Sequence, residues 1–139
     1  MTEDCLFCKI VAGKIPSNKI YEDDSVFAFL DINPASEGHT LVLPKKHFNS
    51  FTEMHSGEVA SLFEAVRKLT SAVEKAFSAE GSNIGINNGK VAGQEVPHTH
   101  VHIIPRKRGD GGRGVKSIVW TEPDTTNLEE VAKKIRRAL

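Results

Sequence analysis

The chain has 139 residues, and its 18 basic and 18 acidic side chains cancel, giving a sequence pI near 7.0. This length is enough for one domain with a real core, and the charge balance gives no reason to expect nucleic acid or an anionic membrane as a partner. No apolar run approaches transmembrane length, and residues 1–4 lack the form of a secretion signal, so we expect a cytoplasmic protein.

The amino-terminal part predicts a short helix followed by three strands. The helix stops at Gly13 and Pro16, which break helices. The first two strands are β-rich runs separated by residues 22–25, a sequence typical of a hairpin turn. The third strand follows the turn at Asn33-Pro34 and ends at Pro44. The expected ranges are 5–12 for the helix and 19–21, 26–30 and 40–43 for the strands.

A long helix is predicted to follow Ser56, which we expect to be its cap, and to end at Gly81. Its apolar residues recur at steps of three and four, which is typical of one buried helix face. We expect all of them to be core. They are Val59, Leu62, Phe63, Val66, Leu69, Val73 and Phe77.

The remainder predicts two more strands and a last helix. The fourth strand covers 83–87, and the fifth contains alternating histidines. Thr126-Asn127-Leu128-Glu129 resembles a capping box that opens a helix through Val131 and Ile135. Strands that follow each other closely, with one long helical insertion, favour an antiparallel meander of the α+β class. No repeat or linker divides the chain, so one domain over 1–139 is expected.

His98, His100 and His102 alternate along the predicted fifth strand. Successive side chains of a strand point to opposite faces, so the three imidazoles should share one face, about 7 Å apart. A neutral imidazole is a nucleophile, a proton carrier and a metal ligand near neutral pH. The alternative is a histidine-rich strand edge, or an incidental metal site.

The two cysteines of the chain, Cys5 and Cys8, form a C-x-x-C pair. In a reducing compartment such a pair indicates half of a zinc site or a redox pair rather than a structural disulfide. A redox pair normally follows a strand, and none is predicted ahead of Cys5. A third alternative is two unliganded cysteines that pack the first helix.

Several ordered motifs together resemble the histidine-triad superfamily, in its small zinc-containing, Hint-like branch of nucleotide-binding proteins. The likeness covers residues 5–108, leaving 109–139 as a carboxy-terminal tail with a helix. The motifs are Cys5-Leu6-Phe7-Cys8-Lys9-Ile10, residues 29–34, the run from Gly38 to His47, Asn87-Asn88-Gly89, Ala92-Gly93-Gln94 and the three histidines.

The resemblance implies a five-stranded antiparallel sheet with a long central helix, assembled as a two-fold homodimer. It implies a purine mononucleotide ligand such as AMP, and hydrolysis at the α-phosphorus of AMP phosphoramidates or related adenylates through a nucleotidyl-histidine. Two alternatives stay open: a dinucleoside polyphosphate hydrolase, and a nucleotide-binding interaction protein with vestigial activity. No nucleic acid or membrane partner is expected.

The resemblance also assigns roles to individual residues. It makes His100 the nucleophile, and His102 a contact to the phosphate or the leaving group. It implies nucleotide contacts from Asp31 (ribose), Ile32 (base), Asn87, Gly93, Gln94 and Glu95. The residues themselves also allow plainer roles, since Asp31 could cap the turn before Asn33-Pro34 and Gly93 could be a loop glycine.

For the metal, the resemblance implies a structural zinc ion held by Cys5, Cys8, His47 and His98. The alternative is that His98 contacts substrate and the cysteines are merely packed. Two further residues are less defined. Glu95 stands where many relatives carry Ser or Thr, and we expect its carboxylate to turn away from the phosphate. His39 is expected to support the sheet or to orient the nucleophile.

Overall fold

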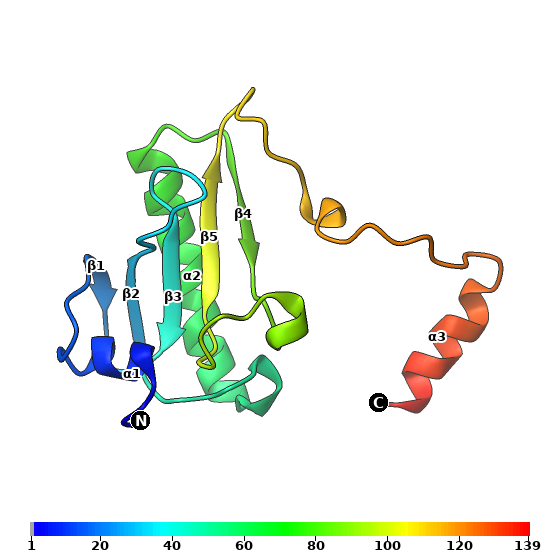
Figure 1. Ribbon diagram of the computed structural model, residues 1–139, viewed down its shortest axis with the longest axis horizontal. Coiled ribbons are helices and arrows are strands. Elements are labelled where there is room, and N and C mark those ends of the chain that lie inside the picture. Colours follow the sequence, from blue (N-terminus) through cyan, green and yellow to red (C-terminus); the bar gives the residue numbers. More distant parts are fainter. Residues whose placement is uncertain (1) are drawn as a thin grey trace.

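The computed structural model describes residues 2–139. It confirms the α+β prediction, because five antiparallel strands form one sheet in the order β1-β2-β3-β5-β4 with a long helix across one face (Figure 1). The strands are β1 (Lys19–Glu22), β2 (Val26–Leu30), β3 (Thr40–Pro44), β4 (Gly81–Gly85) and β5 (Val101–Arg106), and the α-helices are α1 (Leu6–Val11), α2 (Ser56–Ala76) and α3 (Leu128–Arg137).

The expected simple meander is wrong at one position. β5 pairs with β3 on one side and β4 on the other, so β4 becomes the edge strand. The chain leaves β3 through α2, which crosses the sheet and delivers β4 one place further out. The last strand then fills the vacant central place, and this brings its histidines to the middle of the sheet.

Helix α2 covers the sheet face that carries Val26, Val42 and Ile103. Its residues Leu62, Val66, Leu69 and Val73 are buried against that face, as the three- and four-residue spacing predicts. Each such fully buried aliphatic side chain contributes about 1.5–3 kcal/mol to stability.

Three predictions about this helix are wrong. Val59 is only half-buried and belongs to neither apolar cluster. Phe63 is 38% exposed and packs edge-on against Phe51 from the turn Phe51–Glu53, so it lies outside the core. Ser56 is the first helical residue, while His55 occupies the cap position without a side-chain capping bond.

Helix α1 packs on the opposite face of the sheet. There Phe7 and Ile10 contact a second apolar cluster built on the alternate residues of β2 and β3. The Cys5 side chain caps this helix by accepting from the amide of Cys8. Burial of α1 therefore places both cysteines against the sheet, close to the start of β5.

The boundaries of β4 and β5 differ from the prediction. β4 starts at Gly81, where we expected the helix to end, because α2 stops at Ala76 and the chain reverses through Ser78 in a left-handed conformation (φ 50°). β5 starts only at Val101. Consequently His98 and His100 precede the strand, and only His102 lies within it.

Residues 107–139, here called the carboxy-terminal arm, lead away from the sheet and end in α3, which stands apart from the body (Figure 1). No residue of the arm is buried. Asn127, not Thr126, caps α3 by accepting from the amide of Glu130, so the expected capping box is wrong by one residue. Among residues 2–139, none of the helices combines the length and apolarity needed to cross a membrane.

Candidate functional site

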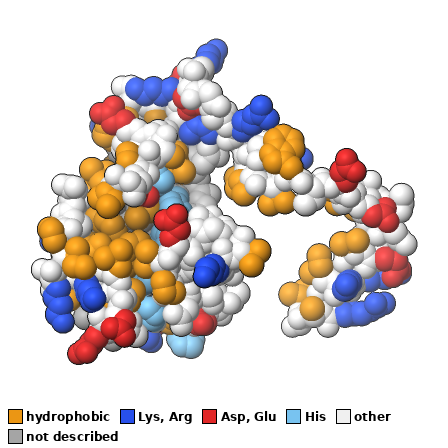
Figure 2. Space-filling view, in the orientation of Figure 1, with side chains coloured by type: hydrophobic (Ala, Val, Ile, Leu, Met, Phe, Trp, Pro, Cys, Tyr) orange, Lys and Arg blue, Asp and Glu red, His pale blue; other side chains and the backbone are white. Residues whose placement is uncertain are grey.

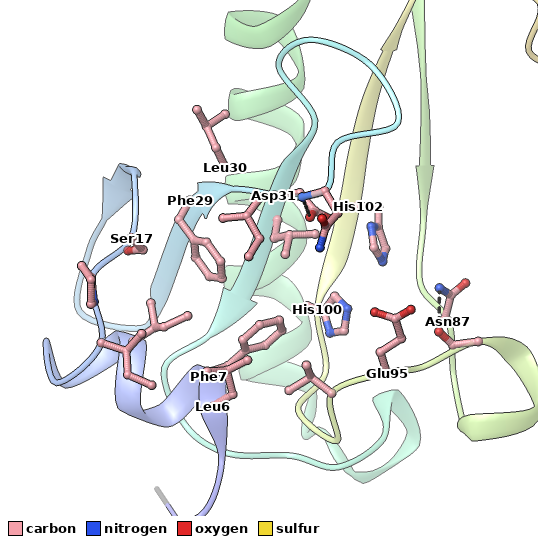
Figure 3. Close-up of a pocket in the computed structure, with 18 residues that line it drawn as sticks. Leu6, Phe7, Ser17, Phe29, Leu30, Asp31, Asn87, Glu95, His100 and His102 are labelled. Carbon is pink, nitrogen blue, oxygen red and sulfur yellow. Dashed lines mark hydrogen bonds between the residues drawn. The ribbon is translucent and has the colours of Figure 1, made fainter.

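A cavity of about 560 Å³ opens beside β5, between α1 and the loop that precedes the strand (Figure 3). One end is apolar and the other polar, and Figure 2 shows the apolar surface lying directly beside the histidines. The apolar end contains Leu6, Phe7, Ile10, Ile15, Pro16, Phe29 and Leu41. The polar end contains Asp31, Asn87, Glu95, His100 and His102.

The cavity brings together most of the predicted nucleotide contacts. Of the residues expected there, it is lined by Asp31, Ile32, Asn87, Gly93, Glu95, His100 and His102. Gln94 does not line it. Its side-chain amide instead accepts from the amide of Gly89 (2.8 Å) and donates to the carbonyls of Asn49 (2.7 Å) and Val96 (3.1 Å), which holds the loop together.

His100 is buried and presents one defined nitrogen to the cavity. Its Nδ1 lies 2.7 Å from the carbonyl oxygen of His98, and because a carbonyl only accepts, Nδ1 carries the proton. In the neutral ring Nε2 is therefore an unprotonated acceptor. Burial lowers the pKa of His100, so the neutral form holds at pH 7. The edge of Phe7 supports the ring, with centroids 4.9 Å apart.

His102 carries its proton on the other ring nitrogen, Nε2, and a chain of three hydrogen-bonded groups determines this tautomer. The amide of Ala35 donates to Nδ1 of His39 (3.0 Å), so the His39 proton is on Nε2. That Nε2 lies 2.9 Å from Nδ1 of His102 and donates to it. The remaining proton of neutral His102 is on Nε2. This atom is buried and has no hydrogen-bond partner among the described residues.

The structure also shows how the two carboxylates of the site, Asp31 and Glu95, are oriented. Asp31 Oδ1 accepts from the amide of Asn33 (2.8 Å), as the turn-capping role requires, while Oδ2 lies 3.6 Å from His39 Nε2 at the cavity. The expectation that Glu95 turns outward is wrong, because its carboxylate points into the cavity between His100 and Asn87 (Figure 3). Its negative charge partly opposes the effect of burial on the pKa of His100.

A second cluster lies behind the cavity. The Sγ atoms of Cys5 and Cys8 and the Nδ1 atoms of His47 and His98 all lie within 4.8 Å of one another. The Nε2 atom of His98 donates to the carbonyl of Pro44 (2.7 Å), which leaves Nδ1 unprotonated toward the thiols. Two thiols and two imidazoles form a complete tetrahedral donor set, so this cluster could hold a metal ion.

His98 connects the two clusters. Its ring belongs to the cysteine cluster, while its backbone carbonyl accepts from His100. Burial lowers the pKa of His98 to about 4, which keeps the ring neutral and able to ligate at neutral pH. The three histidines therefore do not form one row on a strand face, as their alternation suggested, because the His98 ring lies in the cysteine cluster while His100 and His102 line the cavity.

Sequence reasoning missed the apolar end of the cavity. Leu6, Phe7 and Ile10 of α1 form its wall together with Phe29. The apolar spacing of α1 was visible in the sequence, but nothing in the spacing says which of these side chains face the core and which face a cavity. His39 was noticed, yet it contacts His102 and not His100.

Comparison with known protein families identifies the family of the chain. The HIT domain model matches residues 12–109, which include the whole sheet and the residues of the cavity from Ile15 to His102. The chain belongs to the HIT family. Members of this family are nucleotide-binding hydrolases, and both histidines of the cavity, His100 and His102, lie within the matched part.

Individual relatives align with most of the length of this HIT protein. It is 49% identical over 132 residues to an uncharacterised HIT-like protein of Methanocaldococcus jannaschii, covering 95% of this chain and 98% of the relative. It is 44% identical over 135 residues to the adenosine 5'-monophosphoramidase hnt1 of Schizosaccharomyces pombe, again covering 95% and 98%.

Solved structures agree with the fold. A HIT family protein from Bacillus subtilis has a TM-score of 0.87 at 42% identity, covering 99% of this chain and 98% of that one. A Zn-bound histidine triad family protein from Mycobacterium smegmatis has a TM-score of 0.74 at 34% identity, covering 98% of both chains.

Proposed function

We propose that this protein hydrolyses AMP phosphoramidates or related adenylates at the α-phosphorus, with His100 as nucleophile. The observation that carries this proposal is that two residues lining one cavity have complementary nitrogens, a bare Nε2 on His100 and an unpartnered Nε2–H on His102. Displacement at phosphorus needs a nucleophile and a donor for the charge that develops on the phosphate or leaving atom. These two histidines supply both.

In the proposed reaction, the lone pair of His100 Nε2 attacks phosphorus and the bond to the leaving group breaks. The resulting nucleotidyl-histidine is hydrolysed by water, which splits one difficult step into two easier ones. His102 Nε2–H donates a hydrogen bond to a phosphate oxygen or to the leaving atom. The carbonyl of His98 holds the Nδ1 proton of His100 throughout and so keeps the nucleophile aimed.

The other cavity residues are proposed to bind the nucleotide. The apolar end is the place for a purine, because Phe7 and Phe29 offer aromatic surface and Ile32 is 83% exposed at the rim. Asp31 Oδ2 is free for ribose hydroxyls, and Asn87 and Gly93 lie near the phosphate end. Gln94 acts indirectly, since it holds the loop that presents these groups.

The experiment is turnover of an AMP phosphoramidate by His100→Asn, with His55→Asn as the matched control on the exposed cap of α2. We expect His100→Asn to abolish turnover and to retain AMP binding, and His55→Asn to behave as the unchanged protein. Residual activity of His100→Asn within about tenfold of the unchanged protein, a loss of only about 1.4 kcal/mol, would contradict the proposal.

A dinucleoside polyphosphate hydrolase remains the second candidate, and side-by-side turnover of a diadenosine polyphosphate separates the two. A third candidate, a binding protein with vestigial activity, predicts that no nucleotidyl adduct forms. Mass spectrometry of protein quenched during turnover should find the adduct on the unchanged protein and none on His100→Asn.

We also propose that Cys5, Cys8, His47 and His98 hold a structural zinc ion. The support is the complete donor set, the unprotonated Nδ1 of His98, and the Zn-bound relative from Mycobacterium smegmatis. The ion would fix α1 to the start of β5 and leave no open coordination position. Elemental analysis should find about one zinc per chain, and Cys8→Ser should release it and lower the melting temperature. Metal-free protein of undiminished stability would refute the site.

Finally, we propose that residues 1–139 form one domain that assembles as a two-fold homodimer. β4 is an unpaired edge of the sheet, and the apolar side of α3 (Leu128, Val131 and Ile135, 49–64% exposed) has no cover within the described chain. A second copy would cover both. Sedimentation that finds only a 15.2 kDa species at micromolar concentration would contradict the dimer.

A further inference from the structure

Glu95 lies at the junction of two hollows. It lines the polar end of the nucleotide cavity with His100 and His102. It also lines a second hollow of about 490 Å³, together with Lys90, Gln94 and Pro97, and Gly93 is the other residue common to both. The second hollow therefore continues outward from the phosphate end and not from the apolar end.

The place proposed for the base puts the leaving group on this side. The apolar wall built by α1 and Phe29 lies on one side of His100, and Glu95 lies on the other (Figure 3). When the base of a nucleotide occupies the apolar end, the leaving group on its phosphorus points away from that wall. The available space in that direction is the one that Glu95 borders.

The Glu95 carboxylate acts on His100 only through its charge, because it contacts no partner side chain or amide among the described residues. Asp31, the other carboxylate of the cavity, accepts from a backbone amide in its turn. The Glu95 carboxylate, in contrast, makes no hydrogen bond or ion pair with any of residues 2–139 that the structure describes, although it points toward the phosphate end (Figure 3). A free negative charge beside a phosphate repels every anionic ligand unless a cation lies between them.

We propose that Glu95 is a specificity-determining residue that selects substrates whose leaving group carries a positive charge, such as an aminoalkyl amine or an amino acid bearing a free ammonium. The cation would lie between Glu95 and the phosphate and be attracted by both. The same carboxylate discriminates against polyphosphate and sulfate leaving groups. This inference rests on the proposed function, since it assumes that an AMP phosphate lies at His100.

The experiment uses a matched pair of ligands, the aminoethyl ester of AMP and its propyl ester, which have the same shape and differ by one charge. Their dissociation constants are measured by calorimetry on the full chain, on Glu95→Gln, and on Asp24→Asn as a control. Asp24 is an exposed carboxylate in the β1–β2 turn, remote from both hollows. A second measurement compares kcat/KM for the two corresponding phosphoramidates and for the sulfate anhydride of AMP.

The unchanged protein and Asp24→Asn should prefer the cationic ester by at least about fivefold, the effect of one charge pair about 4 Å apart in water. Glu95→Gln should lose this preference and turn over the sulfate anhydride faster. Equal affinity of both esters for the unchanged protein, a preference that survives in Glu95→Gln, or no binding of either ester overturns the inference. A preference lost in Glu95→Gln without any turnover of phosphoramidates would instead support Glu95 and refute the hydrolase.

Discussion

At the scale of single residues, the site depends on which nitrogen of each imidazole carries the proton. The protein uses one nitrogen of each histidine and leaves the other with a defined character: an acceptor on His98 and His100, a donor on His102. None of the three hydrogen-bond partners is ionised. Two are backbone carbonyls and the third is the neutral ring of His39, whose tautomer is determined by the amide of Ala35. The protonation pattern is therefore a property of backbone geometry.

Replacement of His39 tests this pattern. His39→Phe removes the donor to His102 Nδ1, so neutral His102 can take the other tautomer and lose its Nε2–H toward the cavity. We expect kcat to fall about 10²-fold, with a smaller change in KM, because positioned proton donors contribute about 10²–10⁴. His39→Gln, which keeps a donor nitrogen, should recover part of the loss. A variant pair with equal kcat would show that His39 only fills space.

The buried imidazoles also predict a loss of stability in acid. Burial lowers the pKa of His102 from 6.5 to about 4, and that of His39 in the same direction. Above about pH 7 both histidines are neutral in the folded and unfolded chain and contribute nothing. As the pH falls from 6.5 toward 4, the unfolded chain binds protons first, so the free energy of unfolding decreases.

Urea unfolding at several pH values measures this decrease. The slope should be shallower for His102→Asn, which removes one of the depressed groups, and unchanged for the surface control His55→Asn. A free energy of unfolding that stays constant or rises between pH 6.5 and 4 would contradict the burial argument.

Sequence reasoning could name these residues but not their partners. The motif order indicates which histidine is the nucleophile and which residues surround it. Alternation, however, predicted one strand face with three equivalent rings, and β5 begins only at Val101. The roles separate because the backbone before the strand turns the His98 ring toward the cysteines, and no local periodicity encodes that turn.

At the scale of elements, Gly38 allows the loop before β3 to pack closely against Phe77 at the end of α2. Its φ of +92° lies in the region that favours glycine, and an added Cβ would clash with the ring of Phe77. We expect Gly38→Ala to destabilise the fold by about 1–3 kcal/mol, because both the backbone and the packing resist it. His39 and the β3 strand follow directly, so activity should fall as well.

A matched control for this change is Gly57→Ala. Gly57 lies in α2, where nothing approaches a new Cβ within 4 Å, and alanine favours helix over glycine by about 1 kcal/mol. This variant should be as stable as the unchanged protein or more so in thermal unfolding. If both glycine variants behaved alike, the contact with Phe77 would have no energetic role.

Elements with strong local signals were predictable, and those set by distant packing were not. Asp23 stabilises the β1–β2 turn by accepting from the amides of Ser25 and Val26 (2.8 Å each). Because these contacts are between neighbours in the chain, the turn could be predicted from the sequence. The position of β4 at the sheet edge depends on where α2 crosses the sheet, which is a non-local property. Likewise, Phe63 has the spacing of a core residue, but it is 38% exposed and packs against Phe51 instead of the sheet core.

At the scale of the whole molecule, the carboxy-terminal arm is the part that one chain leaves unfinished. Figure 2 shows apolar side chains on its surface, and Trp120 is 79% exposed. Apolar surface of this extent on an amphipathic helix indicates a missing contact, which the homodimer would supply. The amphipathic pattern of α3 was predictable from the sequence, but where it docks was not.

Truncation after Gly114 tests this role of the arm. Because no arm residue is buried in its own chain, the shortened protein should keep its sheet and its near-ultraviolet spectrum. Its dimer dissociation constant should rise at least about tenfold, since the apolar side of α3 no longer contributes. Val131→Asp, a single charge on that side, is the matched full-length variant. Unchanged association in both would mean that the arm has another partner.

The double attachment of His98 has a consequence for how such sequences can diverge. Its ring is held from β3 by the carbonyl of Pro44 and from α1 by the thiols of Cys5 and Cys8. A descendant that loses Cys5 or Cys8 no longer has the complete donor set of the proposed zinc site, and the remaining thiol loses its role as a ligand. The two cysteines should therefore be inherited or lost together. Residue 98 can remain histidine with or without them, because its contact with the Pro44 carbonyl depends on no side chain of β3.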